Sequence, residues 1–75
     1  MKFVHLVTKY KWYDLIDRGK KRIEFRDASD YWAKRLEGAT HAIFHRGYTS
    51  VTMTWNIKKK VKAFGVFEIH LGKRM

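Results

Sequence analysis

The first part of the chain shows two successive hydrophobic periods. Polar and apolar side chains alternate over residues 2–7, which predicts a β-strand with one buried face. Over residues 9–18 the apolar side chains Trp12, Leu15 and Ile16 recur at helical spacing, which predicts a helix with these side chains in the core. The chain is therefore expected to open with a strand that leads directly into a helix.

The two ends of this helix carry residues that suit them. Thr8 can cap its start, because a threonine hydroxyl can accept a hydrogen bond from an unpaired N–H of the first turn. Gly19 can end it, because glycine easily adopts the positive φ found just after a helix. The basic side chains on both sides of Gly19 complement the partial negative charge at the end of the helix.

The stretch after Gly19 combines charge with a strand-like alternation. Over residues 22–26, Ile23 and Phe25 alternate with charged side chains, which predicts that these two face the core while Glu24 faces outward among cations. Residues two apart on a strand are separated by roughly 6.6 Å, so Glu24 can bridge a neighbouring arginine and fix it in place. An edge strand with a charged outer face explains the same pattern equally well.

A second, shorter helix is predicted over residues 30–37. Asp27 or Ser29 can cap its start, and a glycine follows its end. Trp32 and Leu36 are four residues apart, so they share one face of this helix and are expected in the core.

The second half of the chain contains β-strand patterns. Strands are predicted over residues 41–45, 49–57 and 64–71. The lysine run Lys58-Lys59-Lys60, between the last two strands, suits either a phosphate-binding track or a solvated hairpin. The resulting order, β-α-β-α-β-β-β, predicts one α+β domain, a small mixed β-barrel with helices at its side.

The charge of the chain points to a partner. Seventeen Lys and Arg against seven Asp and Glu give a net charge of +10 on 75 residues. This balance favours a polyanion, most commonly nucleic acid. An anionic membrane surface is the rival partner, but no segment joins a basic face to a long apolar stripe. Solubility is the simplest alternative explanation of the charge.

Other compositional features narrow the chemistry. The chain has no cysteine, so it has no disulfide and no thiolate metal site. His41 and His45 are roughly 13 Å apart along one strand, too far for one metal ion. We therefore expect no metal and no cofactor. The first residues form no long apolar run, so we expect no signal peptide, no membrane span and a cytoplasmic location.

Several motifs resemble those of one known family. Gly19-x-Lys21-x-x-Glu24-x-Arg26 resembles the G-x-K-x-x-E-x-R signature of the ASCH domains, relatives of the PUA RNA-binding fold. Tyr31-Trp32-Ala33-Lys34-Arg35-Leu36 and the segments 44–49 and 67–72 are similar to further motifs of small phage and bacterial members. The resemblance covers nearly the whole chain. It implies a single ASCH/PUA-like domain over residues 1–75, a small PUA-like mixed β-barrel with two flanking helices.

The resemblance also implies a site. In ASCH domains the signature lines a cleft between the first helix and the barrel, so Lys21, Glu24 and Arg26 are expected there. Arginine offers a planar, bidentate donor to phosphate. A turn at a strand end is expected to close the other side of the cleft, and Tyr31 with Arg35 forms either a base-stacking pair or an ordinary surface pair. The predicted ligand-binding residues are Lys21, Glu24, Arg26, Arg35, Arg46, Tyr48, Thr49 and Ser50.

Three functions are consistent with this site. The first is binding of RNA or a nucleotide, or of single-stranded nucleic acid in general, by a monomer or dimer. The second is an enzyme in the same cleft, a ribonuclease or modified-nucleoside hydrolase with Lys21 and Glu24 as catalytic residues. Amidohydrolases that resemble ASCH domains have Thr at the position of Glu24, which makes that activity the less favoured one. The third is a protein-interaction module with a basic face.

Overall fold

The computed structural model describes all 75 residues and contains two helices and five strands. In chain order these elements are β1 (Phe3–Thr8), α1 (Tyr10–Asp17), β2 (Ile23–Asp27), α2 (Asp30–Leu36), β3 (His41–Arg46), β4 (Thr52–Ala63) and β5 (Val66–Arg74). The predicted order of strands and helices is confirmed. The main difference in extent is that β4 continues past residue 57 to Ala63, and β5 continues past residue 71 to Arg74.

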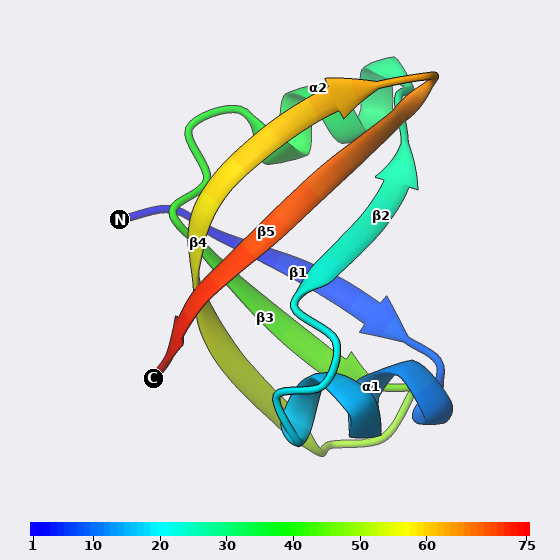
Figure 1. Cartoon of the computed structure of the whole chain (residues 1–75), viewed down its shortest axis with the longest axis vertical. Coiled ribbons are helices and arrows are strands. Elements are labelled where there is room, and N and C mark those ends of the chain that lie inside the picture. Colours follow the sequence, from blue (N-terminus) through cyan, green and yellow to red (C-terminus); the bar gives the residue numbers. More distant parts are fainter.

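The five strands form one mixed sheet. Its order is β1-β3-β4-β5-β2, with β1 and β3 parallel and the other neighbours antiparallel. Figure 1 shows the sheet curling, with β1 and β2 as its two edges. These edges are not hydrogen-bonded to each other as strands, so the sheet is a curled half-barrel where a small mixed β-barrel was expected. The α+β class is confirmed.

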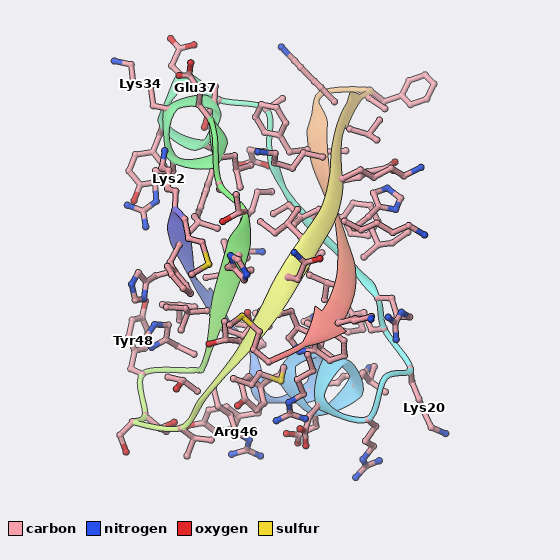
Figure 2. The ribbon with its side chains drawn as sticks, turned by 90° about the vertical axis from the view of Figure 1, so that its left-hand side faces the viewer. Lys2, Lys20, Lys34, Glu37, Arg46 and Tyr48 are labelled. Carbon is pink, nitrogen blue, oxygen red and sulfur yellow. The ribbon has the colours of Figure 1, made fainter.

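The curl of the sheet has a local cause in β4. The pairing of β4 with β5 shifts register on both sides of Ile57, and such irregularities bend a strand and increase its twist. The helices lie at opposite ends of the curled sheet, α1 at the bottom and α2 at the top in both views (Figures 1 and 2). Neither helix has the length and apolar character needed to cross a membrane.

The core lies on the concave side of the sheet. Its most enclosed large side chains are Phe44, Leu6, Ile16 and Ile69. Trp55 is also buried, and Trp32 packs against this core from α2, as expected.

The prediction that Trp12 enters the core is wrong. Tyr13 and Ile16 form the buried line of α1, and Trp12 is 42% exposed at its margin. At about 100° per residue, Trp12 is turned by about 100° from Tyr13 and about 40° from Ile16, so it lies beside the buried line and not on it. The hydrophobic pattern favoured Trp12 over Tyr13 for the core because tryptophan is the more apolar residue. In the structure, Tyr13 has the position that packs against the core.

Of the residues predicted to end or cap the helices, Gly19 and Ser29 are confirmed and Thr8 is wrong. Thr8 belongs to β1 and donates its hydroxyl to the Leu6 carbonyl, so it does not cap α1. Gly19 has φ +73 after α1, as predicted. Ser29 caps α2 by accepting a hydrogen bond from the backbone N–H of Trp32 at 3.3 Å.

The predicted orientation of β2 is reversed. Glu24 is buried, at 6% exposure, and lies opposite Ile69 of β5, whereas Phe25 is 46% exposed. Alternation alone shows that two faces differ, and apolarity normally selects the inner one. Here the inner face of an edge strand carries a carboxylate that is neutralised by cations, so the usual choice fails.

Candidate functional site

A cavity of about 620 Å³ lies at the end of β1, beside α1 and along β2. It is lined by Val7, Thr8, Lys9, Trp12, Lys21, Glu24, Phe25 and Arg26. We call it the cleft. It brings together Lys21, Glu24 and Arg26, the ionisable residues of the signature, in a hollow next to the first helix.

Glu24 is the centre of the charged cluster in the cleft. Its Oε1 lies 3.6 Å from Lys21 Nζ, and its Oε2 lies 3.4 Å from Arg26 Nη1. Oε1 also accepts the backbone N–H of Phe25 at 3.0 Å. Both carboxylate oxygens are therefore engaged, and Glu24 holds two cations in defined places. The expected bridge to Arg26 is present, and Lys21 is a second partner.

Lys21 is held between aromatic rings as well as by Glu24. Its Nζ donates a hydrogen bond to the Ile23 carbonyl and lies 5.7 Å from the Trp12 ring centre and 5.0 Å from that of Phe25. Both rings are more than two-fifths exposed, at 42% and 46%. The cleft therefore offers a fixed ammonium group flanked by two accessible aromatic side chains.

Arg26 connects the two edges of the half-barrel. From β2 its Nη2 donates to the Val7 carbonyl of β1 at 3.1 Å, and its Nη1 donates to the Phe25 carbonyl at 2.8 Å. Its guanidinium also lies 5.4 Å from the centre of the Trp32 ring. The guanidinium thus bridges the two unpaired edges of the sheet through these contacts.

Arg35 lies at a second, smaller cavity. This cavity has a volume of about 390 Å³ and is lined by Lys2, Phe3, Val4, His5, Lys34 and Arg35. The guanidinium of Arg35 lies 5.3 Å from the Tyr31 ring and 5.5 Å from the Trp32 ring, so the predicted Tyr31–Arg35 pair is in contact.

Arg46 and the turn that follows it lie outside both cavities. Arg46 donates to both carboxylate oxygens of Asp14 on α1, at 3.0 and 3.1 Å. This hydrogen bonding lowers the pKa of Asp14 and raises that of Arg46. Figure 2 shows Arg46 at the end of the molecule opposite Lys34 and Glu37.

The turn residues that follow Arg46 line neither cavity. Tyr48 is 96% exposed, and the Thr49 hydroxyl donates to the Arg46 carbonyl. Ser50 is exposed in the same turn. The cleft is closed on its other side by Trp12 and the end of β1, so the structure does not bring this turn to the signature residues.

The residues that sequence reasoning missed are mostly aromatic. Trp12 and Phe25 were assigned to the core and instead line the cleft. The interleaving of aromatic and basic residues around Trp12 was the available signal, because such interleaving is typical of nucleic-acid surfaces. His5 and His45 were far apart in sequence, but parallel pairing of β1 with β3 brings their Nδ1 and Nε2 atoms to 2.8 Å.

No group of three or more His, Cys, Asp or Glu side chains is positioned to hold a metal ion. Models of known protein families and the sequences of curated proteins give no match to this chain. The likeness to ASCH domains therefore depends on the motifs quoted from the sequence alone.

Proposed function

We propose that this chain is a small ASCH-like, PUA-related domain that binds single-stranded RNA or a nucleotide in the cleft. The observation that carries the proposal is the placement of Lys21 and Arg26, fixed by the buried Glu24, next to two exposed aromatic rings.

The cleft offers a matching partner for each part of a nucleotide. Lys21 and Arg26 supply donors for phosphate oxygens, and a guanidinium can bind phosphate through two parallel hydrogen bonds. The exposed faces of Trp12 and Phe25 suit stacking by an unpaired base, the usual way in which proteins hold single-stranded RNA. The net charge of +10 adds an attraction to the backbone that does not depend on sequence.

The contacts of Glu24 favour binding over catalysis. A general base needs a carboxylate with a free lone pair directed at the substrate. Both oxygens of Glu24 face cations, and one also accepts a backbone N–H. The hydroxyl of Thr8, which also lines the cleft, is likewise engaged, because it donates a hydrogen bond to the Leu6 carbonyl. Ribonuclease or nucleoside-hydrolase activity stays the alternative, and it would require Glu24 to leave these partners.

The proposal is tested by titrating labelled single-stranded RNA with the protein at several salt concentrations, following anisotropy and then running the RNA on a gel. We expect intact RNA and an affinity that falls steeply with salt. Trp12→Ala should weaken binding roughly 5- to 150-fold, since stacking of one base on an aromatic side chain contributes about 1–3 kcal/mol. Tyr48→Ala is the matched control, because it removes an exposed aromatic ring away from the cleft.

Each other outcome has a distinct meaning. Cleaved RNA would replace the binding proposal with the enzyme. No affinity at the lowest salt would reject both and leave a protein partner for the basic face. Equal losses in Trp12→Ala and Tyr48→Ala would show that RNA binds somewhere other than the cleft.

A further inference from the structure

We infer that the nucleic-acid site is a track along the free edge of β1, which reaches from the cleft to the second cavity and holds about three consecutive nucleotides. The inference rests on the proposed function and extends it from one nucleotide to a short single strand. The observation behind it is that both cavities are built on the same strand, β1. Val7 lines one of them and His5 the other.

The span of the track follows from strand geometry. Val4 lines the second cavity and Thr8 lines the cleft, and four residues of a strand cover roughly 13 Å. We take the spacing between successive nucleotides of extended single-stranded RNA as about 6.6 Å, the length of two β-strand residues. The span of the track then corresponds to about two nucleotide steps. A mononucleotide is too short to occupy both cavities.

Two guanidinium groups mark the middle of the track. Arg26 donates to the Val7 carbonyl at 3.1 Å, and Arg35 points its Nη2 at the His5 carbonyl from 3.5 Å. Both guanidinium groups lie within about 5.5 Å of the Trp32 ring, which links them. An arginine has five N–H donors, so each group keeps donors for a phosphate after these contacts.

The same contacts argue against an extended peptide as the occupant of this edge. A peptide that adds a strand to a sheet needs the outward-facing carbonyls of the edge strand as hydrogen-bond acceptors. On β1 the carbonyls of His5 and Val7 already face arginine donors. What the edge presents outward is therefore positive charge, which selects an anionic chain.

The second cavity repeats the composition of the cleft. Lys34 is exposed there, and Phe3 is 39% exposed and stacked on His41 at 5.0 Å between ring centres. Lys2 is not available in the same way, because its Nζ donates to the carbonyls of Lys34 and Glu37. An ammonium group and an aromatic face are the elements that hold a phosphate and a base in the cleft as well.

The test is a length series of oligoribonucleotides, from one to six residues, measured by competition against labelled single-stranded RNA. We expect affinity to rise steeply up to about three nucleotides and then to level off, since further residues leave the track. Lys34→Ala should weaken hexanucleotide binding about 3- to 10-fold and leave mononucleotide binding unchanged. It should also reduce the slope of log affinity against log salt by about 0.7, the value for one phosphate contact on a single strand.

Lys59→Ala is the matched control, because Lys59 is an exposed lysine on β4 that lines neither cavity. If mononucleotide and hexanucleotide bind equally, or if Lys34→Ala and Lys59→Ala have equal effects, the track is rejected while the single-nucleotide cleft stands. If no oligonucleotide of any length competes, the proposed function itself fails.

Discussion

Glu24 shows how one buried side chain can organise a binding site. It is 6% exposed on an edge strand, with Lys21 and Arg26 on its two oxygens. A buried carboxylate is costly unless cations and hydrogen bonds compensate it, and here both are present. Glu24 therefore fixes the positions of the two cations.

Substitutions at Glu24 and Lys21 should separate structure from binding. Glu24→Ala is expected to lower the free energy of unfolding by about 3 kcal/mol, because it leaves two cations facing a partly buried gap. Lys21→Ala should lower it by about 1 kcal/mol or less, since Arg26 still neutralises Glu24. The same Lys21 variant should lose most of its RNA affinity. Urea unfolding measures both free energies, and a loss of stability in Lys21→Ala as large as that in Glu24→Ala would contradict these roles.

Trp12 and Phe25 mark the limit of prediction from hydrophobic pattern. Strands and helices could be predicted because alternation and helical spacing depend on local sequence. The face of β2 and the exposure of Trp12 could not, since apolar residues that serve a site break the rule that apolar side chains face the core. The signature residues were found by resemblance, and the aromatic walls of the cleft needed the structure.

The helix α1 is fixed to the end of β3 by an ion pair. Arg46 of β3 makes two hydrogen bonds to Asp14 of α1, and these lower the pKa of Asp14 below its ordinary value of 3.8. The folded state therefore favours the carboxylate form. The stabilisation is present above the ordinary pKa and is lost as the pH falls through the lowered one.

This pair predicts a pH-dependent difference between two proteins. The free energies of unfolding of the wild type and Asp14→Asn should differ by a constant amount from about pH 5 to 7, and this difference should shrink as the pH falls below about 4 toward the lowered pKa of Asp14. Asp30→Asn is the control, because Asp30 has no ion-pair partner. Thermal unfolding at each pH measures the difference, and a difference that stays the same size as the pH falls from about 7 through the acid range would exclude the ion pair as its source.

The hairpin between β4 and β5 contains a local conflict between sequence and backbone. Phe64 has φ +51 and Gly65 has φ +76, and Ala63 pairs with Val66, which describes a two-residue turn of type I′. Asn-Gly suits this turn, whereas a bulky residue at positive φ costs roughly 1–2 kcal/mol. The Phe64 side chain is fully exposed, so packing does not offset that cost.

Phe64→Asn should therefore stabilise the protein. We expect the free energy of unfolding to rise by about 1 kcal/mol, because asparagine tolerates the left-handed region. Gly65→Ala should lower it by a similar amount and serves as the control for the turn type. Chemical denaturation measures both, and an equal or lower stability for Phe64→Asn would show that the ring contributes contacts of its own.

The half-barrel leaves one side open, and that side carries the candidate site. The edges β1 and β2 are joined by Arg26, and α1 covers one end of the sheet next to the cleft. The order of elements and the α+β class were predictable from local patterns. The unpaired edges were not, because strand pairing between distant segments depends on contacts that no local pattern encodes.

The location of the site is tested most directly by an NMR titration of the labelled protein with a short single-stranded RNA. The three tryptophan indole N–H signals give internal probes, since Trp12 lines the cleft and Trp55 is buried at 5% exposure. We predict large shifts for the Trp12 indole and for the backbone of residues 21–26, with Trp55 nearly unchanged. Shifts confined to the lysine run of β4 or to the turn around Tyr48, with Trp12 unmoved, would contradict binding in the cleft.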